Sequence, residues 1–383
     1  MTEQPTTLWD IARLFLKLGT TAFGGPAAHI AMLEREVVER RGWLTEAEFL
    51  DHLGASNLIP GPTSTELVIH IGRRRGGWPG LLVAGACFIL PAALMVAALA
   101  WAYVRYGKMP AVAGLLYGVK PVVIAVILQA LWKLGHSAIK SRWLAAVALI
   151  ALGLSAMGIS PLAVLAVGGA LALAASVVPW RNPASILTWA RAQSLVPAAT
   201  VATATAVSAG LWPIFLIFAK IGAMVFGSGY VLLVFLRAEL VERHAWLTQQ
   251  QLLDAVAVGQ VTPGPVFTTA TFLGYLLHGT TGAIAATLGI FLPAFVLVAV
   301  SAPLIPKIRA SRSAGAVLDG VNVASLALMA VVTWQLARSA IVDWETFTLA
   351  LLSGALLFRF PRMNSAWLVA GAGLLGALRY AFV

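Results

Sequence analysis

The sequence predicts an all-α integral membrane protein with two homologous halves, arranged as inverted-topology repeats that contain broken, re-entrant helices. Three observations support this class. Of the 383 residues, 60% are hydrophobic and 11% are charged, whereas soluble domains carry about 25% charged residues. The second half of the sequence repeats the first, and each half contains an apolar run interrupted by Pro-Gly-Pro. The expected surroundings of the chain are therefore a lipid bilayer.

The internal repeat is visible when residues 15–62 are placed over residues 218–265. The matched positions include rare residue types and both proline triplets: Lys17 with Lys220, Phe23-Gly24 with Phe226-Gly227, Trp43-Leu44-Thr45 with Trp246-Leu247-Thr248, and Asp51 with Asp254. After the triplets the match continues with one deletion. Repeats of this length define the architecture, so we predict copies at 1–190 and 211–383, joined by a connecting segment at 191–210.

Four segments are apolar enough to cross a bilayer, which takes roughly 20 residues: 78–104, 111–132, 282–304 and 314–337. The runs 143–180 and 346–381 each fit two shorter crossings.

Equivalent loops of the two copies differ in charge. Loop 73–77 carries three arginines, but its counterpart 276–281 has only His278. Because cytoplasmic loops are enriched in Lys and Arg, the copies are predicted to be inserted in opposite directions, as in transporters with inverted repeats. This requires an odd number of crossings between them, and 195–211 is the candidate for the extra one.

Each copy has two interruptions, at 23–26 and 60–62 and then at 226–229 and 263–265. Proline removes an amide donor and stops a helix, and the flanking pieces are too short to cross alone. Irregular backbone at this depth is tolerated only beside protein or a water-filled cavity. The alternative is that these residues only kink packed helices, but four breaks in symmetric pairs favour a binding site. The predicted structural breaks are Pro26, Pro60, Pro62, Pro263 and Pro265.

A helix that restarts after a break directs unpaired amides and the positive end of its dipole towards the cavity, which suits an anion. The predicted substrate-binding residues are the glycines and hydroxyls at the breaks: Gly24, Gly25, Gly61, Thr63, Ser64, Thr65, Gly227, Ser228, Gly229, Gly264, Thr268 and Thr269. Lys17 and Lys220 join them, because a cation in an apolar membrane segment is costly and is a functional candidate. The alternative for Lys17 is that it reaches the lipid headgroups beside Arg13.

Glu66 has two interpretations. It follows Thr63 at capping-box spacing, and it could instead carry a proton near the anion, together with His70 one turn further on. The second copy has no carboxylate at this turn, which favours capping.

The remaining ionisable residues receive structural roles. Asp51 and Asp254 are expected to pair with Arg40 and Arg243. Glu36, Glu39 and Arg40 are expected on a solvated face. His29 and His52 have no partner at metal-ligand spacing, so we expect no metal and no cofactor.

Enzyme motifs are missing from the sequence. It contains no GxGxxG after a strand, no GxxxxGK[ST], no GxSxG and no HExxH, so we expect no catalytic activity. The formal charge of +11 is attributed to residues that flank membrane segments rather than to nucleic-acid binding. Besides a carrier, the breaks are compatible with an anion channel or with a membrane scaffold that transports nothing.

Several motifs also resemble the chromate ion transporter family in its two-domain form: Phe23-Gly24-Gly25-Pro26-Ala27-Ala28-His29-Ile30, Gly61-Pro62-Thr63-Ser64-Thr65-Glu66, Gly76-Gly77-Trp78-Pro79-Gly80 and Gln260-Val261-Thr262-Pro263-Gly264-Pro265. The resemblance covers essentially the full chain. It implies export of chromate across the bacterial inner membrane, driven by the proton motive force and conferring chromate resistance, with sulfate as a similar anion. Uptake of sulfate or anion exchange is the competing transport reading. A second copy of the chain, forming a homodimer, is a further partner to consider.

Overall fold

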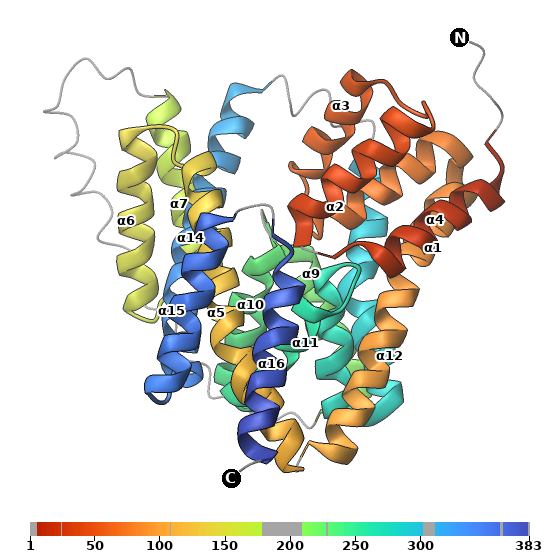
Figure 1. The fold of residues 1–383 in the computed structure, drawn as a ribbon. Helices are drawn as coiled ribbons and strands as arrows, with labels where there is room; N and C mark the ends of the chain where they lie inside the picture. The colour runs from red at the N-terminus through yellow and green to blue at the C-terminus, as the bar shows by residue number, and fades with distance from the viewer. Residues whose placement is uncertain are drawn as a thin grey trace, which may run out of the picture.

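The structure, a computed structural model, describes residues 6–23, 25–107, 109–177, 209–226, 229–301, 311–360 and 363–381. All secondary structure in these residues is helical, which confirms the predicted class (Figure 1). The first copy comprises α1 (Leu8–Thr21), α2 (Gly25–Glu34), the π-helix η1 (Arg35–Arg40), α3 (Glu46–Ser56), α4 (Thr63–Tyr106), α5 (Pro110–Ala138), α6 (Arg142–Ala156) and α7 (Pro161–Val177). The second repeats this order with α9 (Leu211–Met224), η4 (Gly229–Val231), α10 (Leu232–Leu236), η5 (Arg237–Arg243), α11 (Gln249–Val261), η6 (Val266–Thr268), α12 (Thr269–Ser301), α14 (Arg312–Ala340), α15 (Trp344–Arg359) and α16 (Ser365–Ala381).

α4 folds back on itself at a glycine turn and therefore has two arms. Gly77 in the turn has φ +62°, and Gly279 gives α12 the same turn with φ +60°. In a straight helix Gly72 and Gly80 would be about 12 Å apart. A Cβ on Gly72 would instead lie 2.4 Å from the carbonyl oxygen of Gly80. Residues 63–75 are thus a short arm of α4 and residues 78–106 a long one.

The predicted long spans are confirmed. α4, α5, α12 and α14 are long and apolar enough to cross a membrane. The two shorter pairs, α6 with α7 and α15 with α16, occupy the runs where two short crossings were expected.

The two copies are antiparallel. Arg73 at the turn of α4 donates from Nη1 to the carbonyl oxygens of Val298 (3.1 Å) and Ala299 (2.6 Å), near the end of α12. Lys140, just after α5, pairs with Asp319 near the start of α14 at 3.1 Å. The beginning of each long helix thus lies beside the end of its counterpart. This confirms the predicted inversion and defines two faces of the bundle: the arginine-rich face, which contains loop 73–77, and the opposite face.

The broken segments enter from one face and return to it. α1 starts beside the turn of α4, since a Cβ on Gly76 would lie 2.8 Å from Ile11 Cδ1, and it ends deeper along the long arm. The guanidinium of Arg74 lies 3.5 Å from Glu48, which brings the start of α3 back to the arginine-rich face. α1 with α2 is therefore one re-entrant segment, and α3 with the short arm of α4 is another. Their counterparts in the second copy enter from the opposite face.

The last two helices of each copy pack on the other copy. α16 lies along α5, and α7 lies along α14 (Figure 1). Glycines allow this close approach: a Cβ on Gly118 of α5 would lie 1.9 Å from the carbonyl oxygen of Ala372, and one on Gly320 of α14 would lie 2.3 Å from that of Gly168. Small residues at such crossings are the usual route to helix association in membranes. Neither copy has a complete core without the other.

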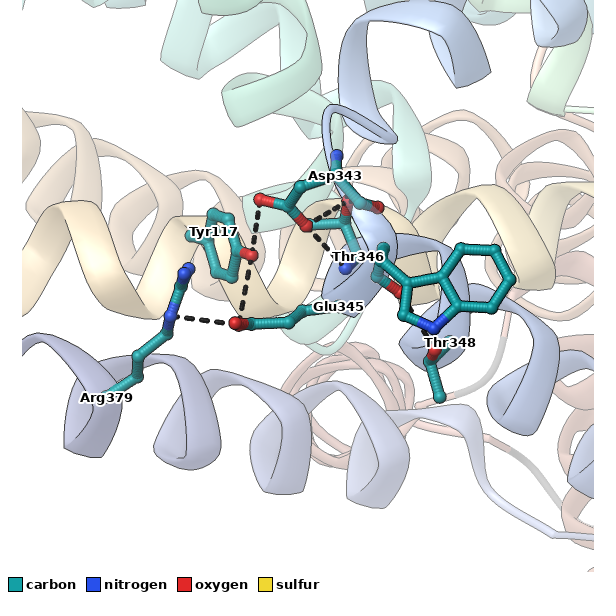
Figure 2. A network of polar contacts seen from close by, with 7 residues as sticks. Tyr117, Asp343, Glu345, Thr346, Thr348 and Arg379 are labelled. Carbon is teal, nitrogen blue, oxygen red and sulfur yellow. Dashed lines mark hydrogen bonds and ion pairs between the residues drawn. The ribbon is translucent and has the colours of Figure 1, made fainter.

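A polar cluster fastens this exchanged packing on the opposite face (Figure 2). The hydroxyl of Tyr117 on α5 lies 2.7 Å from Asp343 Oδ2 and 3.3 Å from Glu345 Oε2. Arg379 of α16 pairs with Glu345 at 2.9 Å, and its guanidinium covers the Tyr117 ring at 4.7 Å. Asp343 also caps α15 by accepting the Thr346 amide. The cluster thus joins α5 to both helices of the exchanged pair.

The expected extra crossing at 195–211 lies outside the described residues except for 209–211, as does most of the connecting segment. The proposed copy boundaries therefore stay predictions.

Gly376→Ala should show whether close helix contact or helix propensity decides how an added methyl group on α16 changes stability. A Cβ on Gly376 would lie 2.1 Å from the Gly114 carbonyl oxygen, whereas one on Gly371 of the same helix would meet nothing within 4 Å. We expect Gly376→Ala to cost about 1–3 kcal/mol through overpacking and to lower the midpoint of thermal unfolding in detergent. Gly371→Ala is the matched control and should unfold at the wild-type temperature or above. Equal midpoints in the two variants would contradict this packing.

Candidate functional site

The four breaks meet at one junction between the copies. Gly61 donates its amide to the carbonyl oxygen of Val225 at 2.7 Å, and Gly264 donates to Ala22 at 2.9 Å. These bonds are equivalent, since each runs from the triplet of one copy to the first break of the other. Within Pro-Gly-Pro only the glycine has an N–H. The single donor of each triplet is therefore used to join the copies.

Glycine is required at this junction for shape as well. Gly61 has φ +140° and Gly264 has φ +91°, values that residues with a Cβ rarely adopt. A Cβ on Gly264 would lie 2.5 Å from Ala92 Cβ and 3.1 Å from the carbonyl oxygen of Gly19. Ala92 is halfway along the 78–106 arm of α4. The junction is therefore at the middle of the membrane span, as the broken segments predicted.

The predicted hydroxyls differ between the copies. In the second copy, Thr268 and Thr269 are buried and donate to the carbonyl oxygens of Pro265 and Val266, both at 2.8 Å. In the first copy, Ser64 and Thr65 are buried at the start of α4. Thr65 Oγ1 has no hydrogen-bond partner among the described residues. The first copy therefore has the hydroxyl that is available to a ligand.

Glu66 does not form the expected capping box. α4 begins at Thr63, and the residue at its cap position is Pro62, so the Thr63 side chain is already inside the helix. The Glu66 side chain is fully buried, and within the described chain neither carboxyl oxygen has a hydrogen-bond partner. Its Oε1 lies 2.2 Å from the position that a Cβ on Gly61 would occupy. The carboxyl group therefore adjoins the junction.

Two histidines continue from Glu66 towards the arginine-rich face. His70 lies one turn further along the short arm, is buried, and has no partner for Nε2 in the described part of the chain. Its ring centroid lies 5.7 Å from that of His52 on α3. Sequence analysis left His52 without a role, because only the antiparallel packing of α3 on the short arm brings the two rings together.

His29 was also missed and lies at the junction itself. Its Nε2 is 3.0 Å from the Ala22 carbonyl oxygen, the same atom that accepts the Gly264 amide. A carbonyl can only accept, so Nε2 carries the proton. In the neutral ring Nδ1 is then the acceptor, 3.5 Å from the Ser64 hydroxyl oxygen. His29 therefore connects the first break to the restart of α4.

The two predicted lysines have carboxylate partners. Lys17 lies 2.9 Å from Glu36, and Lys220 lies 2.5 Å from Glu239 at the equivalent position. The Lys17 side chain is 53% exposed. An anion would have to compete with these carboxylates, so a role for either lysine in binding stays a prediction.

Two expectations about charged residues were wrong. Glu36 is buried rather than solvated, and it pairs with Arg40 at 2.7 Å as well as with Lys17. Arg243 lies 3.6 Å from Glu239 and not beside an aspartate. Asp254 instead pairs with Lys120 of the other copy at 2.7 Å. The Lys17–Glu36 and Lys120–Asp254 contacts are made across helices, and sequence spacing does not indicate them. Arg40–Glu36 and Arg243–Glu239, by contrast, are i,i+4 pairs within one helical segment.

Other predicted residues are located only in part. Gly24, Gly227 and Ser228 lie outside the described residues. Gly25 and Pro26 open α2, and Gly229 opens η4. Among the described residues, no group of three or more His, Cys, Asp or Glu side chains could hold a metal ion.

The family described as Chromate transporter matches residues 9–173 and 212–377, which is one match for each copy. The chain belongs to the chromate transporter family. It is 35% identical to the chromate transport protein of Cupriavidus metallidurans, over 98% of this chain and 94% of that protein. It is 34% identical to the probable chromate transport protein of Synechococcus elongatus, over 91% and 89% of the two chains.

A third relative, the chromate transport protein of Pseudomonas aeruginosa, is 33% identical over 95% of this chain and 90% of that protein. No solved structure matches the chain.

Gly264→Ala should test the junction. The new methyl group meets Ala92 and is strained at this φ, so we expect a loss of about 1–3 kcal/mol and of most transport. Gly135→Ala, where a Cβ would meet nothing within 4 Å, should keep both stability and transport. Thermal unfolding and vesicle uptake of labelled chromate are the measurements. Wild-type behaviour of Gly264→Ala in both would contradict the junction.

Proposed function

We propose that this protein is a secondary carrier that exports chromate from the bacterial cytoplasm across the inner membrane, is driven by the proton motive force, and confers chromate resistance. Membership of the family and the names of the relatives support chromate as the substrate. The observation that carries the proposal is the mid-membrane junction of four helix breaks, beside a buried carboxyl group that has no hydrogen-bond partner among the described residues. Inverted repeats with broken helices at the midplane are typical of carriers that alternate access.

The proposed anion site is the junction itself. The short arm of α4 directs its first amides and the positive end of its dipole towards the junction, and Ser64 and Thr65 add hydroxyls there. Gly61 and Gly264 allow the backbones of the two copies to approach each other closely at this site. Such a site recognises charge and size, so we include sulfate, another tetrahedral dianion, as a substrate of the same site.

The distribution of charge supports export as the direction of transport. The basic residues of the arginine-rich face include Arg40, Arg41, Arg73, Arg74, Arg75 and Lys140. By the positive-inside rule this face is cytoplasmic. A dianion that leaves a cell with a negative interior gains about 4.6 kcal/mol per 100 mV of membrane potential, since each charge contributes about 2.3 kcal/mol. Membrane potential therefore favours export.

Glu66 is the proposed proton carrier, with His70 and His52 as its route to the cytoplasm. An ionised carboxylate buried without a partner is costly, so Glu66 should hold its proton in this state. The negative charge that appears when Glu66 releases its proton would repel an anion at the junction. Protonation of Glu66 would therefore favour anion binding, so chromate flux should depend on pH. The membrane-potential component of the proton motive force would drive the export itself.

Glu66→Gln should uncouple transport from the pH gradient. In proteoliposomes, we expect wild-type chromate flux to saturate and to rise several-fold with an imposed pH gradient. In Glu66→Gln the response to the gradient should be lost while flux driven by membrane potential remains. Glu46→Gln makes the same change on the exposed first turn of α3 and should behave as wild type.

The same assay separates the competing functions. Labelled sulfate in place of chromate tests the second substrate. A flux that neither saturates nor responds to pH in the wild type, with ohmic single-channel currents, would identify an anion channel and overturn the proposal. Transport of neither anion would overturn it as well.

A further inference from the structure

The two copies do not hold equivalent positions, although their sequences correspond. Leu253 of α11 is fully buried, whereas its counterpart Leu50 of α3 is 52% exposed. Asp254 is buried and its counterpart Asp51 is exposed. α11 packs on α5 and α14 in the centre of the bundle, whereas α3 packs mainly on α4 (Figure 1). The second copy's re-entrant segment is therefore docked on the centre of the bundle, and the first copy's is not.

A buried ion pair holds the docked segment. Lys120 Nζ lies 2.7 Å from Asp254 Oδ1, and the two side chains are 10% and 4% exposed. The Tyr103 hydroxyl donates to Asp254 Oδ2 at 2.8 Å. Lys120 and Tyr103 belong to the first copy, and Asp254 belongs to the second. The pair therefore crosses the plane along which the copies would move.

Packing alone does not account for this pair. Lys120 lies in an apolar span and its counterpart in α14 is Asn322, so the repeat does not require a lysine here. A buried ion pair contributes little net stability compared with apolar residues of similar size, and an ionisable residue within a membrane span is a functional candidate. The charges are better explained by a state in which they separate.

A polar cavity adjoins the pair. It has a volume of about 290 Å³ and is lined by Lys120, Asp254, Tyr103, Tyr117, Gln250 and Ser339, among others. Tyr117 belongs to the cluster of Figure 2, and Tyr103 and Gly107 are at the end of α4, so the cavity lies towards the opposite face. A chain of polar side chains thus leads from that face to the ion pair.

We propose that Lys120 and Asp254 form the gate of the anion pathway on the opposite face. The gate is closed here by their ion pair. When α11 withdraws from α5, the pair separates and Lys120 faces the opened path, where its charge receives the anion that leaves the junction. Calling the passing ion an anion rests on the proposed function; the gate itself does not.

In the state with the gate on the opposite face open, the two copies would have exchanged their conformations. α3 would then dock on α14, which places Asp51 near Asn322 on the arginine-rich face. That contact has a single charge, so the gate on the arginine-rich face is held less tightly than the one on the opposite face. The state with α11 docked, which is the state seen here, is therefore the resting one.

Cysteine labelling tests the gate without any substrate. Val258→Cys, one turn beyond Asp254 on the same face of α11, is placed in a Cys87→Ala background. A membrane-impermeant maleimide is added outside intact cells. We expect Asp254→Asn to raise the labelling rate about tenfold. The matched control, Asp319→Asn, breaks the Lys140 ion pair between the copies and should leave the rate unchanged. Lys120→Asp with Asp254→Lys should restore slow labelling. Equal rates in Asp254→Asn and its parent, or in Asp254→Asn and the charge-exchanged variant, would overturn the gate.

Chromate flux in proteoliposomes tests the role of Lys120. Lys120→Gln and Asp254→Asn both break the pair, but only the first removes the positive charge. We expect Lys120→Gln to raise the KM for chromate several-fold, with Asp254→Asn keeping a KM near that of wild type. An equal KM in both variants would overturn anion binding by Lys120. Zero flux in every protein, wild type included, would refute the proposed substrate, whereas the labelling result would still decide the gate.

Discussion

Two reciprocal hydrogen bonds between backbones hold the breaks of the two copies together, and the rest of the site depends on them. Each Pro-Gly-Pro triplet has one N–H, and that N–H is given to the other copy. An unpaired amide buried in a membrane is costly, so neither triplet is satisfied when its copy is alone. The bonds place four helix ends at one depth, and that depth is where Glu66, Ser64 and His29 gather.

The backbone of this protein is nearly two-fold symmetric, but its ionisable chemistry is not. The copies share the junction bonds and the lysine–glutamate pairs. Glu66, His70, His52 and His29 belong to the first copy, and their counterparts are Thr268, Phe272, Ala255 and Leu232. The first copy therefore has a row of ionisable side chains between the junction and the arginine-rich face, while the buried Lys120–Asp254 pair lies towards the other face. A backbone with two-fold symmetry can exchange the conformations of its two copies. Because the copies have different ionisable groups, the two resulting states differ chemically.

Much of the fold could be predicted from the sequence, because the repeat, the charge of the loops and the proline triplets are local signals. The long spans, the inversion and the breaks follow from such signals. Side-chain partners across helices do not follow from local signals. The sequence does not indicate that Glu36 pairs with Lys17, and it suggests Arg243 rather than Lys120 as the partner of Asp254. Lys120 is detectable in the sequence as the lone charged residue in the run 111–132. Its counterpart in the second copy is an asparagine, so the residues that the two copies share do not include it.

The exchange of terminal helix pairs has a consequence for how the protein is made. α5 leaves the ribosome long before α16, yet α16 is the helix that covers its glycine surface. Gly114 and Gly118 of the first copy therefore stay uncovered by α16 until the final residues have been synthesised. Truncation near the C-terminus would therefore damage the N-terminal copy, and separately expressed halves would have to find each other before either became a finished unit.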